Sequence, residues 1–153
     1  DGYIGDAART FPVGRVSEEA RKLMDVTRLA LEAGIDKARK DNRLFDISRA
    51  VQETGEAAGF SVVREYTGHG VGRKMHEEPQ VPNYVWDGPN IRLQVGMVLA
   101  IEPMVNIGTY KTMVLPDEWT VVTADGSLSA HFENTVAITE NGPCVLTTVQ
   151  EMR

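Results

Sequence analysis

The chain has 153 residues and a net charge of −6, with 42% hydrophobic and 25% charged residues. This composition is ordinary for one globular domain with a sizeable core, and the acidic balance argues against nucleic acid or a membrane surface as the main partner. The longest apolar run, residues 95–100, is too short to span a bilayer, no secretory signal is visible, and the one cysteine, Cys144, cannot form an internal disulfide, so we expect a cytoplasmic protein.

The first part of the chain predicts a strand followed by a helix. Residues 1–6 are typical of a turn, and residues 6–13 of a strand. Ser17 is a candidate N-cap, and the apolar residues that follow recur at helical spacing. We expect this helix to run to about Arg39, with its later turns weakened by Gly34.

A second helix and several strands follow. Asp46 is a candidate N-cap of this helix, and Gly59 stands at its expected C-terminal stop. Residues 60–65 should form a strand that leads to His69, whereas residues 82–90 contain the proline and glycine residues of a loop. Four further strands are predicted over residues 97–106, 119–123, 127–139 and 145–148. No repeat or linker divides the chain, which predicts a single domain portion over residues 1–153.

Residues 67–81 contain two of the three histidines. His69 lies between Gly68 and Gly70, so the backbone can lie close to whatever the imidazole binds. A histidine between glycines is more often a turn residue than a metal ligand, and both interpretations stay open from this stretch alone. His76 begins an extended segment or loop, because Pro79 disfavours helix at the residue before it.

Glu102 interrupts an otherwise apolar strand. A strand that is apolar on both faces is typical of one that is covered on both sides. A buried carboxylate without a partner is costly, so Glu102 is expected to be protonated, paired with a cation or bound to a metal. A buried ion pair with an arginine explains this strand equally well.

The strand over residues 127–139 alternates an apolar face with a polar face. Ser129, His131 and Glu133 share the polar face, and solvent exposure would normally explain such a pattern. However, the strand contains no lysine or arginine, which favours the wall of a cation site.

Four separate segments thus each supply one ligand-type side chain: Asp6, His69, Glu102 and Glu133. Carboxylate and imidazole ligands without a thiolate suit Mn²⁺, Fe²⁺, Co²⁺ or Zn²⁺. Three carboxylates are too few to balance two divalent cations, so the set is one carboxylate short of a dinuclear site.

The segments DGYIGDAARTF, TGHGVGRKMHEEPQV, AIEPMVNIG and SLSAHFENTVAITENG occur in the order found in type I methionine aminopeptidases, and the resemblance covers essentially the whole chain. It implies an α+β, pita-bread fold, of which this chain resembles the C-terminal half: an antiparallel curved sheet backed by two helices. The N-terminal half and its metal-binding aspartate are expected to lie upstream, as a complementary partner. Asp1 corresponds to a connecting turn and not to that ligand.

The resemblance also implies an activity and a role for each site residue. The activity is removal of the N-terminal methionine from nascent proteins and peptides by hydrolysis, with two divalent metal ions activating a water molecule. The implied metal ligands are Asp6, His69, Glu102 and Glu133.

Glu102 is also the implied general base, and His76 is expected to hydrogen-bond the peptide group of the substrate. Trp119 and Met75 correspond to the methionine side-chain pocket, although Met75 occupies a position that is often aromatic in the family. His131 stands where many relatives have glutamine, and with Ser129 it is expected to contact the ligands and not the metals.

Three other interpretations remain. The chain is alternatively another pita-bread peptidase, such as a proline-specific aminopeptidase or dipeptidase, although HEEPQV after GHGVG favours the methionine enzymes. A non-catalytic peptide-binding module should have lost metal ligands, whereas all four expected here are present. A truncated form should hydrolyse Met-peptides poorly by itself, because one carboxylate and part of the substrate-binding wall are absent.

Overall fold

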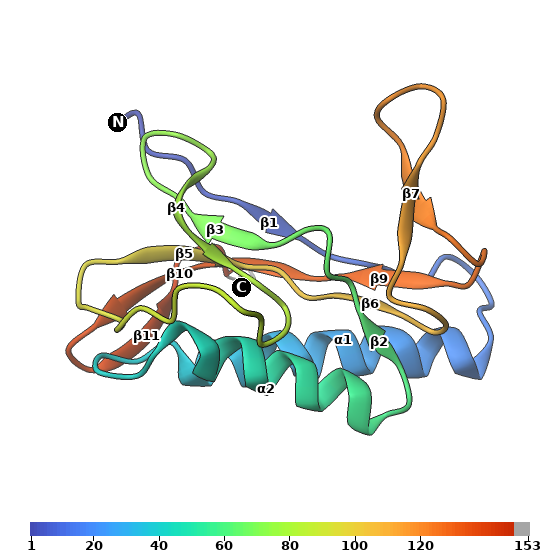
Figure 1. Ribbon diagram of the computed structural model, residues 1–153, viewed down its shortest axis with the longest axis horizontal. Helices are drawn as coiled ribbons and strands as arrows, with labels where there is room; N and C mark the ends of the chain where they lie inside the picture. The colour runs from blue at the N-terminus through green and yellow to red at the C-terminus, as the bar shows by residue number, and fades with distance from the viewer. Residues whose placement is uncertain (149–153) are drawn as a thin grey trace.

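The computed structural model describes residues 1–148. Two helices cover one face of a curved antiparallel sheet, and two projections rise from the opposite face (Figure 1). No helix in residues 1–148 is both long and apolar enough to cross a membrane.

The first helix, α1 (Glu18–Lys37), begins where the sequence predicts. The Ser17 hydroxyl accepts a hydrogen bond from the backbone N–H of Ala20 at 3.1 Å, which satisfies one of the free donors of the first turn. The helix ends at Lys37, two residues earlier than predicted, because Ala38 leaves helical geometry and its N–H bonds to Ile35 O.

The second helix, α2 (Leu44–Ala57), begins earlier than predicted. Asp46 is not the N-cap. It occupies the third helical position, and its side chain accepts a hydrogen bond from the backbone N–H of Arg43 at 2.8 Å. Asp46 therefore closes the helix start from inside the first turn, as the acidic member of a capping box does. The stop near Gly59 is confirmed, since this glycine has a φ of 85° just after the C-cap.

Eleven strands are present in the described part of the chain. They are β1 (Ala7–Ala8), β2 (Ser61–Val62), β3 (Gly68–Gly70), β4 (Glu77–Val81), β5 (Val98–Ile101), β6 (Met104–Asn106), β7 (Thr112–Val114), β8 (Val121–Thr123), β9 (Ser129–His131), β10 (Glu133–Thr139) and β11 (Gly142–Val145). The main sheet has the order β1–β10–β5–β3–β4, with β11 also paired to β10. A smaller sheet has the order β2–β6–β9, and β7 pairs with β8.

Two long predicted strands each divide at the same place in space. Residues 97–106 split into β5 and β6 around Glu102 and Pro103, and residues 127–139 split into β9 and β10 at Phe132. β5 pairs with β10 in the main sheet, whereas β6 pairs with β9 in the smaller one. Both segments thus pass from the main sheet to the smaller one at the same place, which we call the crossing. There the N–H of Phe132 donates a hydrogen bond to Pro103 O. Glu102, His131 and Glu133 all lie at this crossing.

The shorter predicted strands are only partly correct. The strands predicted over residues 6–13, 60–65 and 119–123 are reduced to β1, β2 and β8. The last prediction, residues 145–148, is shifted: β11 begins at Gly142, whose φ of 111° lets the chain reverse directly after β10.

The core lies between the helices and the sheet. α1 packs against β5, β6, β9, β10 and β11, and α2 packs against α1, β2 and β4. Gly34 lies inside the continuous helix α1 and permits its contact with α2, since a Cβ at this position would lie 2.9 Å from Val51 Cγ2 and 3.3 Å from Ile101 Cγ2.

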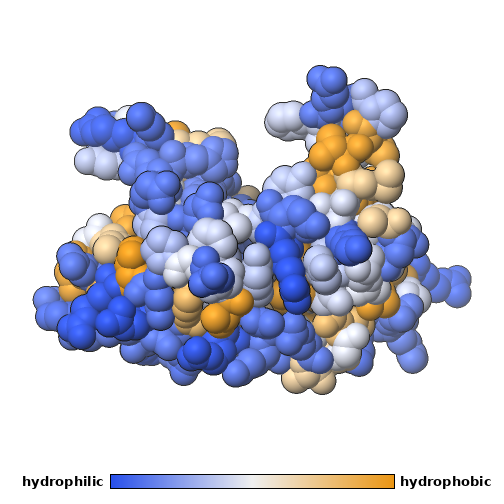
Figure 2. All heavy atoms as spheres, in the orientation of Figure 1, coloured by the Kyte–Doolittle hydropathy of each residue, from blue (hydrophilic) through white to orange (hydrophobic). Residues whose placement is uncertain are grey.

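The opposite face is hollowed between the two projections (Figure 2). One projection is the connection between β3 and β4 with the N-terminal segment beside it, and the other is the β7–β8 hairpin (Figure 1). Apolar side chains are exposed on the hairpin, including Met113, Val114 and Val121. The helices therefore cover one face of the sheet, and the hollow lies on the other face.

Candidate metal centre

The structure brings the four predicted ligand residues together. Asp6 precedes β1, His69 lies in β3, Glu102 follows β5 and Glu133 begins β10. His69 Nε2 is 3.4 Å from Glu102 Oε1 and 3.8 Å from Asp6 Oδ2. One ligand atom each of Asp6, His69 and Glu133 lie within 4.8 Å of one another. Side chains 127 residues apart in sequence therefore form one compact donor set.

The two glycines beside His69 allow β3 to lie in close contact with both neighbouring strands. A Cβ at Gly68 would lie 2.3 Å from Ala100 O, and one at Gly70 would lie 2.2 Å from Glu78 O. This stretch is a strand and not the tight turn that a histidine between glycines suggests. The close backbone approach that we expected is present, and it holds His69 between β4 and β5.

The His69 ring is oriented by a backbone carbonyl. Nδ1 lies 2.9 Å from the carbonyl oxygen of Gly70, and a carbonyl can only accept, so Nδ1 donates this hydrogen bond. Nε2 faces the carboxylates of Asp6 and Glu102. A backbone carbonyl that fixes one ring nitrogen in this way is the usual arrangement behind a metal-binding imidazole.

Asp6 is held by a residue that the sequence analysis did not single out. The N–H of Asp6 donates to Thr135 Oγ1 at 2.7 Å, and the same hydroxyl donates to Asp6 O at 2.8 Å. The N–H of Thr135 in turn donates to Thr147 Oγ1 at 3.0 Å. Thr135 lies on the polar face of β10, and that was the only signal in the sequence that pointed to it.

Glu133 is buried beside two other carboxylates. Only 4% of its surface is exposed, and its Oε1 has no hydrogen-bond partner among the described residues. Burial, followed by the nearby charges of Glu102 and Asp6, raises the pKa of Glu133 to about 7. The ion pairs in residues 1–148 give Glu102 two imidazoles, those of His69 and His131, and no arginine. The ion pair with an arginine that we considered for Glu102 is therefore wrong.

This donor set fits a divalent cation. A buried oxygen without a partner and three mutually repelling carboxylates are costly, and a cation among them would remove both costs. Oxygen and nitrogen donors without sulfur suit the harder first-row divalent metals.

A sequence model described as Metallopeptidase family M24 matches residues 1–140. The chain belongs to metallopeptidase family M24. A Clostridium perfringens methionine aminopeptidase is 59% identical over 150 residues, which are 98% of this chain and 60% of that relative. Methionine aminopeptidase 1 of Bacillus subtilis is 52% identical over 149 residues, which are 97% of this chain and 60% of the relative. The chain thus spans 60% of the length of each of these relatives.

Solved structures of similar proteins have the same fold. The crystal structure of a Thermotoga maritima methionine aminopeptidase superimposes with a TM-score of 0.92 at 51% identity, over 96% of this chain and 59% of that one. The dipeptidase PepE of Mycobacterium ulcerans gives 0.74 at 26% identity, over 97% of this chain and 35% of that one. The predicted fold is therefore confirmed: this M24 chain is a portion of the pita-bread fold, a curled antiparallel sheet with two helices.

His76 lies beside the M24 donor set. The centroids of the His69 and His76 rings are 4.4 Å apart, with the rings inclined at 66°. Both histidines line a pocket of about 680 Å³ with Lys74 and the start of β4. His76 precedes β4, so the extended segment predicted after it is confirmed. Its neighbour Met75 is half exposed.

Two other predicted residues of this M24 chain belong to neither group of candidate ligand atoms found in residues 1–148. Trp119 is 87% exposed in the turn of the β7–β8 hairpin, and it does not line the pockets beside His76 or His131. Ser129 donates its hydroxyl to Val105 O at 3.3 Å within the smaller sheet.

Proposed function

We propose that this chain is the larger part of a cytoplasmic methionine aminopeptidase, which removes N-terminal methionine from peptides and nascent proteins by hydrolysis with two divalent metal ions. The observation that carries the proposal is the convergence of the Asp6, His69, Glu102 and Glu133 side chains into one donor set. The methionine aminopeptidases at 59% and 52% identity support this substrate class.

The metal ions would supply a water molecule of lowered pKa and polarise the scissile carbonyl group. Among the chain's own residues, Glu102 has a partly buried carboxylate that can accept a proton from water and return it to the leaving amine. The exposed His76, whose ring contacts that of His69, can donate a hydrogen bond to the substrate's peptide oxygen.

Met75 and Trp119 are proposed to contact the methionine side chain. Met75 adjoins His76, so an apolar side chain bound beside it lies next to the peptide bond to be cut. Trp119 lies in the turn of the β7–β8 hairpin, where its indole is free to be covered by a ligand or by a further segment of the protein.

A complementary N-terminal segment is proposed to complete the site. Asp6, Glu102 and Glu133 provide three negative charges against the four positive charges of two divalent cations, so one further carboxylate would balance the centre. The relatives are longer than this chain, and a further segment of that kind could supply this carboxylate. By itself, the 153-residue chain should then hydrolyse Met-peptides poorly.

A chimera tests this proposal. The part of the Clostridium perfringens relative that matches this chain is replaced by the chain, and release of free methionine from a Met-Ala-Ser peptide is measured with added Co²⁺ or Mn²⁺. The chimera should release methionine, and His76→Ala in it should lower kcat by roughly 10²–10³-fold while the bound metal is retained.

The rival functions predict different products. Cleavage of Xaa-Pro dipeptides in preference to Met-Ala-Ser would identify a proline-specific peptidase and overturn the proposal. A folded, metal-loaded chimera that binds Met-peptides without cutting them would identify a peptide-binding module. Full turnover by the 153-residue chain alone would contradict the need for a complementary segment.

A further inference from the structure

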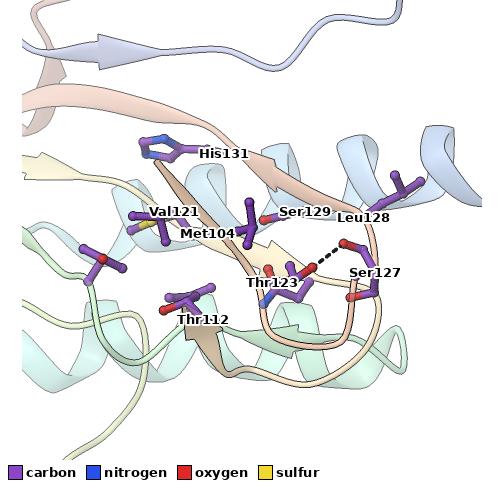
Figure 3. A pocket seen from close by; sticks show the side chains of 13 residues that line it. Met104, Thr112, Val121, Thr123, Ser127, Leu128, Ser129 and His131 are labelled. Atoms are coloured by element: carbon purple, nitrogen blue, oxygen red, sulfur yellow. Dashed lines mark hydrogen bonds between the residues drawn. The ribbon is translucent and has the colours of Figure 1, made fainter. Parts of the chain in front are cut away.

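The β7–β8 hairpin stands up from the sheets (Figure 1). β7 and β8 pair with each other and with no other strand in residues 1–148. Figure 3 shows a cavity of about 620 Å³ beside the hairpin, bordered by its Thr112 and Val121 and by Met104 and His131 of the smaller sheet. A two-stranded hairpin is marginally stable by itself, so contacts at its base must decide how it stands over this cavity.

The hydrogen bonds at the base of the hairpin join its two ends to each other. Asp125 Oδ2 accepts a hydrogen bond from the N–H of Thr109 at 2.7 Å, and Ser127 Oγ accepts one from the N–H of Gly108 at 3.2 Å. Both bonds connect the segment before β7 with the segment after β8. They keep the hairpin closed, but they do not hold it against the segments that border the cavity from the other side.

An arginine makes such a connection. The Arg64 guanidinium carbon lies 4.2 Å from the centre of the Tyr110 ring and 5.1 Å from the centre of the Tyr84 ring. Tyr110 lies two residues before β7, Arg64 in the connection between β2 and β3, and Tyr84 in the connection between β4 and β5. One guanidinium group thus contacts two segments besides its own, and one of them is the base of the hairpin.

The two tyrosine rings are the partners of the Arg64 charge. None of the ion pairs found in residues 1–148 includes Arg64. A planar guanidinium stacks on aromatic faces and is attracted to a ring within about 6 Å of its centre. The neighbouring Val63 donates its N–H to Met104 O at 2.9 Å, which anchors this segment to the smaller sheet. The stack therefore links the hairpin, through Tyr110, to a part of the fold that is itself fixed.

We propose that Arg64 is a positioning residue for the substrate-binding wall. Its guanidinium, stacked between Tyr84 and Tyr110, holds the base of the β7–β8 hairpin. The hairpin carries Trp119 in its turn, so the arginine sets where this indole lies relative to the sheets. The inference rests on the proposed function for the contact between Trp119 and the methionine side chain. Because Trp119 does not line the pocket beside His76, losing the stack should weaken substrate binding and leave the chemical step unchanged.

Steady-state kinetics of the chimera test the effect on substrate binding. Arg64→Met removes the charge and keeps a long side chain, so KM for Met-Ala-Ser should rise by about 5-fold or more while kcat stays within about twofold. Tyr110→Leu should act in the same direction, whereas Tyr110→Phe keeps the ring and should behave as wild type. The matched control is Lys22→Met, which removes a cation 5.0 Å from the centre of the Phe60 ring and should leave KM unchanged.

A double variant shows whether the arginine and the tyrosine act through one contact. Arg64→Met combined with Tyr110→Leu should raise KM no further than the more severe of the two single changes, because each change already removes the same interaction. Independent effects on stability would instead add. Circular dichroism melting of each variant checks that the fold is retained.

Trp119 reports the motion of the hairpin without any peptide hydrolysis. Trp86→Phe leaves Trp119 as the only tryptophan of the 153-residue chain. Time-resolved fluorescence anisotropy of this chain separates local motion from the tumbling of the whole molecule or of any self-associated species. With Arg64→Met the amplitude of the fast decay should rise by about 1.5-fold or more, since loops that lose a contact move on the nanosecond scale and slower. Tyr110→Phe should leave it unchanged.

Three results would overturn the inference. They are an unchanged anisotropy decay in a folded Arg64→Met chain, an unchanged KM of Arg64→Met in an active chimera, and a Tyr110→Phe variant as weak as Tyr110→Leu. A chimera without aminopeptidase activity would overturn the proposed function instead. The anisotropy of the chain would then still decide whether Arg64 holds the hairpin.

Discussion

Glu133 lies buried between Asp6 and Glu102, and the pKa of its carboxyl group is raised to about 7 from an ordinary 4.5. A folded-state pKa above the unfolded one means that the folded protein binds more protons between these two values. In the absence of metal, its contribution to stability is present below pH 4.5 and is lost as the pH rises through about 7. Without metal, the negative charge of the Glu133 carboxylate, which would bind a cation, therefore lowers the free energy of unfolding.

Glu133→Gln should remove this pH dependence. In EDTA at pH 8 the variant should be more stable than wild type by roughly 1–3 kcal/mol, and the difference should vanish near pH 4.5. Urea unfolding at several pH values measures it, with the exposed Glu65→Gln as the matched control. Equal stability of Glu133→Gln and wild type at pH 8 would contradict the account.

Thr135 is the residue through which β10 holds Asp6. Thr135→Val removes both hydrogen bonds to the Asp6 backbone, so the affinity for Co²⁺ should fall by about 10-fold or more and the free energy of unfolding by roughly 1–3 kcal/mol. Thr135→Ser keeps the hydroxyl and should restore most of both. Cation titration and urea unfolding test this pair of variants, and a serine variant as weak as the valine one would show that the hydroxyl is not the cause.

At the residue scale, the candidate metal ligands could be predicted from the sequence, but the residue that positions Asp6 could not. Glu102 could be predicted because a carboxylate in an apolar strand demands a partner, and Glu133 because its strand face carries no lysine or arginine. Thr135 could not be predicted, because its partner depends on the register of β1 against β10, where Ala8 lies opposite Glu133.

At the scale of the elements, the position of the site follows from two strands that change sheets together. Pro103 has no N–H to give to a ladder, so β5 ends and β6 begins around it. The sequence predicts two long strands, since residues 97–106 are apolar on both faces apart from Glu102 and residues 127–139 alternate regularly. Nothing in the sequence around Phe132 predicts that the strand divides there. The division arises from pairing with the segment that contains Pro103.

The contact between the helices at Gly34 gives a prediction about packing. Gly34→Ala should gain up to about 1 kcal/mol of helix propensity but lose roughly 1–3 kcal/mol through overlap with Val51, so we expect a net loss of stability. The double variant with Val51→Ala should be more stable than the sum of the two single changes predicts, because the shorter side chain makes room for the new methyl group. Urea unfolding of the four proteins measures this coupling, and strict additivity would contradict the proposed contact.

At the scale of the whole molecule, one face is covered by helices and the other is open. Phe11, Val13 and Trp119 are 74%, 88% and 87% exposed, and the hollow lies between the two projections (Figure 2). Exposed apolar side chains promote association, and the relatives have further chain that this sequence does not match. The sequence predicted this portion of the fold through its motifs, whereas the upright position of the β7–β8 hairpin, with Trp119 in its turn, became evident only from the structure.

The 153-residue chain should therefore self-associate. Light scattering after size-exclusion chromatography should show species heavier than 16.8 kDa, and Phe11→Ser with Val13→Ser should shift them toward the monomer. A chain that stays monomeric at high concentration would show that the open face needs no cover.

The central claim is that Asp6, His69, Glu102 and Glu133 converge on divalent cations. Anomalous diffraction from crystals of the chain soaked in Co²⁺ tests it directly, because the cobalt positions are found without reference to any expected ligand. The account predicts anomalous peaks among these four side chains. Peaks elsewhere on the molecule, or none at a Co²⁺ concentration that saturates binding in solution, would contradict it.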